Sequence, residues 1–435
     1  MDQFIIEGPT RLEGEVETAG AKNAALPCLA AALLTSEPVA LSNLPDVRDM
    51  RTLQKLLRHI GAHVDASPAS PEKATVEART IGSADAPYDL VKTMRASVLV
   101  LGPLLARSGS VRVSLPGGCA IGVRPIDLHL AAFRKMGAEV TLEHGTIEAK
   151  AARLMGAEIL FDTVTVTGTE NVMLAATLAR GTTRVRNAAR EPEVVDLAVL
   201  LKAMGARIAG EGTETIVIEG VERLHGASHS VVPDRIEAGT YALGAALTRG
   251  DVSVTGCRPE HLKALTTRLA AAGVSVEAGP ERLRVRATGA LAAHDVATAP
   301  YPGFPTDLQA QWMALATSMD GVSTVTETVF ENRFQHVPEL VRMGARIRQE
   351  GRWAVVEGPS RLTGASVMAS DLRASAALVL AGLAASGETT VDRVYHLDRG
   401  FVHMEKKLNA LGARVRRTST PTGERPIAGY VRETP

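Results

Sequence analysis

A pattern of apolar and polar positions recurs six times along the chain. In each copy, apolar residues at helical spacing lead to a glycine, and residues that alternate between apolar and polar follow, as in "VPELVRMGARI". This order predicts a helix, a left-handed glycine after its last turn, and then a strand. The recurring glycines are about 70 residues apart, a period that indicates internal repetition. They are Gly61, Gly137, Gly205, Gly273, Gly344 and Gly412.

A second pattern lies upstream of the first within these repeats. It consists of a small-residue helix without a polar face, a polar stop and a strand, as in "MLAATLARGTTRVRN" and "MALATSMDGVSTVTE". A helix that is apolar on all sides is a buried helix. Each unit is therefore predicted to run helix, strand, loop, helix, strand, strand. Six such units favour a globular α/β fold with helices inside and sheets outside.

Three units make about 200 residues, which is a plausible domain size. We therefore expect a first domain of residues 22–230 and a second domain of residues 1–21 plus 231–435. The N-terminal segment is assigned to the second domain because "FIIEGPTRLEG" resembles "AVVEGPSRLTG" at residues 354–364. A cleft between two matching halves is a preferred place for a ligand.

Charge and composition exclude several classes of partner. Lys plus Arg and Asp plus Glu both number 48, and aromatic residues make up 3%, so no global feature favours nucleic acid or a membrane surface. The apolar runs are too short to span a bilayer, and the N-terminus does not resemble a signal peptide. We expect a cytoplasmic protein with no obligatory protein partner. The three cysteines form no metal-binding motif, so no metal or cofactor is expected.

Charged residues gather at the predicted starts of buried helices and in the loops that follow. Lys22 and Asn23 open the first helix, where backbone N–H groups favour an anion. Arginine pairs well with carboxylate and phosphate groups, and phosphate-loop and dinucleotide motifs are absent from the sequence. The pattern therefore favours a small anionic ligand. The other residues of this set are Arg95, Arg124, Asp127, Asp307, Arg333, Asp371, Arg373 and Arg399.

The three cysteines differ in their surroundings. Cys28 and Cys257 lie in apolar segments and are expected to be buried and unreactive. Cys119 lies in "PGGCAIG", five residues before Arg124. A glycine-rich loop beside positive charge lowers the pKa of a thiol and is typical of a lid over a substrate. Cys119 is therefore the candidate reactive thiol.

Together these motifs resemble the enolpyruvyl transferases, on the side of the family that uses a UDP-sugar acceptor. The resemblance covers nearly the whole chain and rests on "GAKNAALP", "LVKTMRAS", "LPGGCAIGVRPIDLH", "NAAREPEVVDL", "LPDVRDM", "FPTDLQAQ", "TETVFENRF", "ASDLRAS" and "YHLDRGF". It implies two inside-out α/β barrels of three units each, with the active site between them. It also implies transfer of enolpyruvyl from phosphoenolpyruvate to the 3′-hydroxyl of UDP-N-acetylglucosamine, the first committed step of peptidoglycan synthesis. Phosphate is released, and no metal takes part.

The resemblance also implies roles for individual residues. Cys119 is the proton donor, can carry a covalent phosphoenolpyruvate adduct and is the target of the epoxide fosfomycin. Asp307 is the base, and Lys22 and Arg399 take part in catalysis. The implied phosphoenolpyruvate contacts are Lys22, Asn23, Arg124, Arg333, Arg373 and Arg399. The implied UDP-sugar contacts are Asn23, Arg95, Arg124, Pro125, Ile126, Asp127, Leu128, Thr165, Val166, Asp307 and Val329.

One stretch departs from the family pattern. In "TVTVTG", Thr163 replaces a lysine that the family often has near the uridine, and Thr165 takes the place of a serine.

Two other functions stay open. The first alternative is the sister reaction on shikimate 3-phosphate. The second is a catalytically silent relative that binds the sugar nucleotide.

Overall fold

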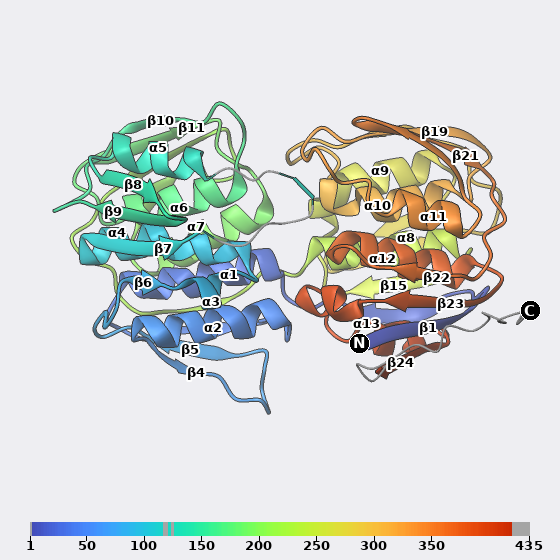
Figure 1. The fold of residues 1–435 in the computed structure, drawn as a ribbon, viewed down its shortest axis with the longest axis horizontal. Helices are drawn as coiled ribbons and strands as arrows, with labels where there is room; N and C mark the ends of the chain where they lie inside the picture. The colour runs from blue at the N-terminus through green and yellow to red at the C-terminus, as the bar shows by residue number, and fades with distance from the viewer. Residues whose placement is uncertain (1, 116–120, 123–125, 420–435) are drawn as a thin grey trace, which may run out of the picture.

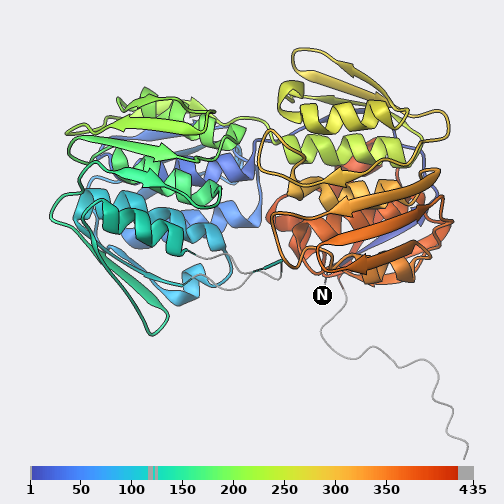
Figure 2. The ribbon, with the colours of Figure 1, turned by 90° about the horizontal axis from the view of Figure 1, so that it is seen from above.

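The computed structural model describes residues 2–115, 121–122 and 126–419. Figures 1 and 2 show two α/β lobes side by side. The first lobe has its apolar core between Ala21 and Val232. The second lobe has a separate core, built from Phe4–Val16 and from Ile236–Val415. The chain therefore passes between the lobes twice, and backbone hydrogen bonding joins the two passages where Ala21 N donates to Val232 O at 2.8 Å.

Each predicted unit contributes a helix that is largely buried, as the lack of a polar face predicts. Small side chains such as those of α1, "KNAALPCLAA", let these helices pack closely in the interior. The buried helices are α1 (Lys22–Ala31), α4 (Leu101–Ser108), α6 (Val166–Ala176), α8 (Arg235–Leu247), α10 (Gln309–Ala316) and α12 (Leu372–Ala384).

The second helix of each unit ends at the predicted glycine. All six recurring glycines have φ between 89° and 110°, the left-handed region that glycine adopts without strain. A strand follows each of them, so this prediction is confirmed. The second helices are α2 (Arg48–Ile60), α5 (Asp127–Lys135), α7 (Pro192–Ala203), α9 (Lys263–Ala271), α11 (Val337–Arg342) and α13 (Met404–Ala410).

Short helices complete the described chain. They are η1 (Ala32–Leu34), α3 (Tyr88–Val91), η2 (Arg95–Val100), η3 (Pro259–Leu262), η4 (Thr306–Leu308) and η5 (Val394–Arg399).

The described strands form six four-stranded sheets of one design. A leading strand runs parallel to the strand that follows the buried helix, and two antiparallel strands complete the sheet. The first lobe has β14 (Ala227–Ser230)-β3 (Val39–Ser42)-β5 (Ala74–Glu77)-β4 (His63–Asp65), β6 (Asp85–Ala86)-β7 (Ser110–Ser114)-β9 (Thr146–Lys150)-β8 (Glu139–Glu143) and β10 (Glu158–Leu160)-β11 (Thr182–Arg186)-β13 (Thr215–Glu219)-β12 (Arg207–Ala209).

The second lobe repeats this design, with one strand supplied by the N-terminus. Its sheets are β2 (Glu13–Glu17)-β15 (Asp251–Thr255)-β17 (Arg282–Arg286)-β16 (Ser275–Ala278), β18 (Val296–Ala297)-β19 (Gly321–Thr326)-β21 (Trp353–Gly358)-β20 (Arg346–Glu350) and β22 (Ser366–Met368)-β23 (Gly387–Asp392)-β1 (Asp2–Gly8)-β24 (Val415–Ser419). Strand β1 occupies the position that β21 has in its own sheet, which explains the sequence likeness between the two segments. In the part of the chain that is described, each sheet is open and none closes into a barrel.

No helix between residues 2 and 419, outside the gaps at 116–120 and 123–125, is long and apolar enough to cross a lipid bilayer.

The close packing of the first lobe leaves no room for a side chain at Gly220, which follows β13. A Cβ atom at this position would lie 1.7 Å from the backbone oxygen of Ala179. We expect Gly220→Ala to lower the free energy of unfolding by about 1–3 kcal/mol, because backbone must move to relieve the clash. Exposed Gly289 has no atom within 4 Å of such a Cβ, so Gly289→Ala is the control. Urea unfolding followed by circular dichroism measures both, and equal stability of the two variants would contradict this account of the packing.

Candidate active site

A buried carboxylate joins cations from the two lobes. Lys22 opens α1 in the first lobe and Arg399 ends η5 in the second lobe. Asp49, in the first turn of α2, accepts a hydrogen bond from Lys22 Nζ at 3.2 Å and from Arg399 Nε at 3.0 Å. The Asp49 side chain is only 5% exposed. Two residues that are distant in the sequence and predicted to bind the same ligand are thus held at one point.

The protonation of this cluster reflects burial and charge together. Burial lowers the pKa of Lys22, and the charges of Arg373 and Arg399 lower it further, against the opposing effect of Asp49. Burial raises the pKa of Asp49, but the charges of Lys22 and Arg399 outweigh it, so that the pKa lies below its usual value. Helix η5, which carries Arg399, packs against α12, which carries Arg373, so a second cationic group lies close by.

That second group surrounds Asp307, in η4 at the start of α10. Arg333 Nη2 donates to Asp307 Oδ1 at 2.7 Å, and Arg373 Nη2 donates to Asp307 Oδ2 at 2.7 Å. Burial disfavours the ionised carboxyl, yet the charges of Arg373 and Arg333 hold the pKa of Asp307 well below its usual range. Asp307 is therefore a carboxylate at neutral pH.

Each of these arginines also has a donor left over. Both guanidinium groups are about 95% buried. Arg333 Nε and Arg373 Nη1 are buried without a hydrogen-bond partner among the described residues. A buried donor without an acceptor is unfavourable. These two donors are suited to an acceptor oxygen supplied by a ligand.

Local contacts hold the two arginines in place. Arg333 Nη1 donates to Thr306 Oγ1 at 2.9 Å, and Thr306 Oγ1 donates to buried Glu327 at 2.8 Å. Glu327 also accepts from the backbone N of Val329 at 2.8 Å, which shapes the loop that carries Val329 and Arg333. Arg373 follows the N-cap residue Asp371, whose side chain accepts from the backbone N of Arg373 at 2.9 Å.

Further contacts cross between the lobes beside this cluster. Arg235, the first residue of α8, donates to Glu193 Oε1 of α7 at 2.9 Å, and both side chains are at least 90% buried. The backbone N of Tyr301 donates to Glu191 Oε1 at 3.2 Å. Burial lowers the pKa of Arg235, but the charge of Glu193 outweighs this effect. Asp307 adds a smaller effect in the same direction as Glu193, so the pKa of Arg235 lies above its usual value. The starts of α7, α8 and η4 therefore share one charged region.

The residues assigned to the UDP-sugar lie mainly in the first lobe. Arg95 is the first residue of η2, and Thr165 caps α6 by accepting from Gly168 N at 3.2 Å. Burial, with a smaller contribution from the charge of Arg95, lowers the pKa of His129 in α5 to about 4. The exposures of the remaining residues vary: Ile126 is buried, Leu128, Val166 and Val329 are half-buried, and Asn23, Asp127 and Thr163 are exposed.

The cysteine predictions can be compared with the structure in part. Cys119, Arg124 and Pro125 lie outside the described residues. Next to them, the backbone oxygen of Ile121 accepts from Asn332 N of the second lobe at 3.1 Å. Cys28 and Cys257 are buried, as expected. Burial raises the pKa of Cys257 to about 11 and raises that of Cys28 well above its usual value, so neither is a reactive thiolate at neutral pH.

Sequence reasoning brought several residues of this site to attention and missed others. Lys22, Arg399, Asp307, Arg333 and Arg373 meet in two neighbouring clusters. The missed residues are Asp49, Glu193, Arg235 and Glu327. Asp49 and Glu193 belong to the motifs "LPDVRDM" and "NAAREPEVVDL". A cation at the start of a buried helix needs an acidic partner, and this need was the signal that pointed to acidic residues in these motifs.

The Asp307 cluster makes stability depend on pH. A carboxyl whose pKa is depressed by folding stabilises the fold above its unfolded pKa of about 3.9 and loses this effect as the pH falls through the folded pKa. We expect Asp307→Asn to lower the free energy of unfolding at pH 7 by about 2 kcal/mol, because two buried arginines lose their opposite charge and one of them loses its acceptor oxygen. The difference should shrink below pH 4. Urea unfolding from pH 3 to 7 measures it. A difference that persists unchanged at pH 3, or that equals that of the exposed control Glu222→Gln, would contradict the charge-pairing explanation.

Comparisons with known proteins identify the family of this chain. Residues 6–408 match the family described as EPSP synthase (3-phosphoshikimate 1-carboxyvinyltransferase). The UDP-N-acetylglucosamine 1-carboxyvinyltransferase of Koribacter versatilis is 57% identical over 418 residues, 96% of either chain. The protein of the same name from Solibacter usitatus is 58% identical over 421 residues, 96% of this chain and 100% of that protein.

Solved structures share the fold. The enolpyruvyl transferase NikO of Streptomyces tendae is 30% identical, with a TM-score of 0.88 over 97% of this chain and 99% of that chain. EPSP synthase from Acinetobacter baumannii, at 19% identity and a TM-score of 0.74 over 97% of this chain and 100% of that chain, shows the likeness of fold alone. The chain therefore belongs to the enolpyruvyl transferase family, and within it to the UDP-N-acetylglucosamine 1-carboxyvinyltransferases.

Proposed function

We propose that this chain transfers the enolpyruvyl group of phosphoenolpyruvate to the 3′-hydroxyl of UDP-N-acetylglucosamine and releases phosphate. Two neighbouring ion-pair clusters with contributions from both lobes carry the proposal: Lys22 and Arg399 pair with Asp49, and Arg333 and Arg373 pair with Asp307. Phosphoenolpyruvate carries a carboxylate and a phosphate, and bidentate arginines suit both groups. The names of relatives more than 55% identical to this chain support the choice of acceptor.

The donor would exchange places with carboxylates of the protein. Asp49 and Asp307 now accept the hydrogen bonds of four cationic side chains. The phosphate or carboxylate group of phosphoenolpyruvate would take over some of these hydrogen bonds. It would also accept from the unpartnered N–H groups of Arg333 and Arg373. Each arginine that turns from Asp307 to phosphoenolpyruvate would make Asp307 a stronger base. The pKa of Asp307 rises toward its usual value when an opposite charge moves away from it. Donor binding would thereby prepare the base.

The chemical steps follow from the residue types. In the addition step, the sugar 3′-oxygen attacks C2 of phosphoenolpyruvate while its proton passes to Asp307, and the methylene carbon takes a proton from the thiol of Cys119. In the elimination step, the methyl carbon returns a proton to the Cys119 thiolate, the double bond re-forms and the C2–O bond to phosphate breaks, and Asp307 then releases its proton to solvent. Lys22 and Arg399 would stabilise the charge on the departing phosphate. The steps balance without a redox reagent or a metal.

The same proposal assigns the remaining predicted residues. Arg95, Thr165, Val166, Asp307 and Val329 would bind the UDP-sugar. The UDP-sugar would also contact Asn23, Arg124 and the segment 125–128. Of these, Asn23 and Arg124 would contact phosphoenolpyruvate as well.

We also propose that residues 22–230 and residues 1–21 plus 231–435 are two domains, each an inside-out α/β barrel of three units. The separate apolar cores support this division. Contacts such as Arg399 with Asp49 would then form and break as the domains close over the substrates.

The acceptor can be tested directly. With phosphoenolpyruvate and UDP-N-acetylglucosamine we expect stoichiometric release of phosphate and formation of the enolpyruvyl ether, measured by a phosphate assay and mass spectrometry. Shikimate 3-phosphate in place of the UDP-sugar is the matched comparison. Turnover with shikimate 3-phosphate alone would assign the chain to the sister reaction. Sugar-nucleotide binding without turnover of either acceptor would indicate a silent relative.

The role of Cys119 can be tested by substitution. We expect fosfomycin to add once, at Cys119, because Cys28 and Cys257 are buried and have raised pKa values. Cys119→Asp keeps a proton donor without a soft nucleophile and should stay active and resist fosfomycin. Cys119→Ser, a much weaker acid, should lose most turnover. Peptide mapping locates the adduct. An adduct on Cys28 or Cys257, or inactivation of Cys119→Asp, would show that Cys119 is not the reactive group.

A further inference from the structure

Three side chains that the proposed reaction does not use meet inside the first lobe. Cys28 lies in α1, Asp196 in α7 and His229 in β14. One donor atom from each of them lies within 4.8 Å of the other two. Cys28 is buried, and the side chains of Asp196 and His229 are 10% and 9% exposed. A thiol, a carboxylate and an imidazole are three of the ligand types that Zn²⁺ prefers.

Hydrogen bonding satisfies only part of this cluster. His229 Nε2 lies 3.0 Å from Asp196 Oδ1, yet Nε2 has no hydrogen-bond partner among the described residues. Cys28 Sγ lies 3.9 Å from Asp196 Oδ2. Around a tetrahedral Zn²⁺, with bonds of about 2.0–2.3 Å to these donors, neighbouring ligand atoms lie about 3.3–3.7 Å apart. The two separations from Asp196, which involve its two different oxygens, lie within a few tenths of an ångström of this range, and Cys28 Sγ lies within 4.8 Å of a ring nitrogen of His229.

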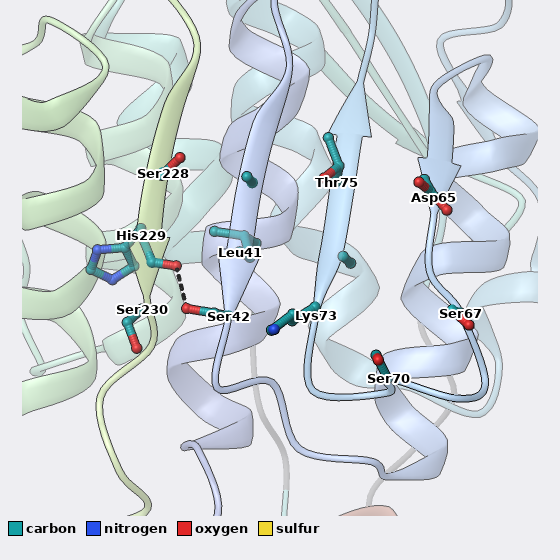
Figure 3. A pocket seen from close by; sticks show the side chains of 12 residues that line it. Leu41, Ser42, Asp65, Ser67, Ser70, Lys73, Thr75, Ser228, His229 and Ser230 are labelled. Carbon is teal, nitrogen blue, oxygen red and sulfur yellow. Dashed lines mark hydrogen bonds between the residues drawn. The ribbon is translucent and has the colours of Figure 1, made fainter.

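The fold explains why a histidine faces inward here. His229 pairs in parallel register with Leu41 of β3, whose side chain is buried. Paired residues on neighbouring strands point to the same face of a sheet, so His229 faces the helices. Figure 3 shows its ring beside β14. Its neighbours Ser228 and Ser230 point to the opposite face of the sheet, where they line an exposed groove with Ser42 and Lys73.

We propose that Cys28, Asp196 and His229 bind a divalent transition-metal ion of the Zn²⁺ type through Sγ, a carboxylate oxygen and Nε2. On binding, the Cys28 thiol releases its proton to solvent and the thiolate sulfur forms the metal bond. The fourth position stays available to water. The three residues are distant in the sequence, and for this reason motif spacing predicted no metal.

The location gives the ion a structural consequence. Asp196 Oδ2 also accepts from Val232 N at 3.3 Å, and Val232 lies in one of the two passages between the lobes. The other passage reaches α1, which begins with Lys22 and contains Cys28. A bound ion would tie β14, α1 and α7 together next to both passages. It would therefore stabilise the first lobe without contacting the substrates.

Cobalt provides a direct probe, because a thiolate bound to Co²⁺ gives a charge-transfer absorption. We would titrate Co²⁺ into the chelator-treated, tag-free full chain with Cys119→Ser and Cys257→Ser, which leaves Cys28 as the single thiol. We expect one ion per chain with a charge-transfer band, which Zn²⁺ displaces. Adding Cys28→Ser should abolish the band, and adding His229→Gln should weaken Co²⁺ binding by about 10-fold or more.

Thermal unfolding gives a second readout. Zn²⁺ should raise the Tm of the wild type, because it binds the folded chain preferentially. It should not raise the Tm of Cys28→Ser, Asp196→Asn or His229→Gln. Replacement of the exposed His59 by Gln is the control and should respond as the wild type does. The proposal is overturned if the band is absent, if it survives Cys28→Ser, or if variants with native circular dichroism keep the wild-type response to Zn²⁺.

Discussion

Four cations from two separate lobes converge on two carboxylates, and the architecture of the site depends on this pairing. Lys22 and Arg399 contact Asp49, while Arg333 and Arg373 contact Asp307. Like charges this close repel one another, and removing them from water is costly unless each has an opposite charge. The two carboxylates meet that need and keep the guanidinium and ammonium groups pointed at one region. They also leave two buried donors for a ligand.

The repeated units explain how such charges come to meet. A helix that is buried along its length is solvent-accessible only near its ends, so charged residues of these segments collect at helix starts. Lys22 opens α1, Arg373 lies in the first turn of α12 and Asp307 lies in η4, which leads directly into α10. The segments that follow β19 and β23 bring Arg333 and Arg399, the last residue of η5, to the same ends. Six copies of one unit thus offer six similar positions, and the two lobes bring several of them together.

Carboxylates in the interior take on different roles according to their neighbours. Glu193 pairs with Arg235 between the lobes, and Glu237 of α8 pairs with Lys407 of α13 within the second lobe. Glu327 accepts from the hydroxyls of Thr298 and Thr306 and from the backbone N of Val329, all neutral donors, and shapes a loop. Asp196 has a thiol and an imidazole beside it rather than a cation of the site. The same side chain therefore pairs charge, orders backbone or offers metal ligation, depending on which donors the fold places around it.

The sequence by itself determined the parts of this protein that depend on local periodicity. The period of the glycines, the buried helices, the strands after each helix and the candidate arginines could all be predicted, because helical and strand spacing and left-handed glycines act over a few residues. Its family motifs directed attention to Lys22, Asp307 and Arg399. The tertiary structure alone decided which charges pair, since Asp49 and Arg399 are 350 positions apart in the chain. It also decided the meeting of Cys28, Asp196 and His229, because contacts between helices and an edge strand depend on packing and leave no periodic trace in the sequence.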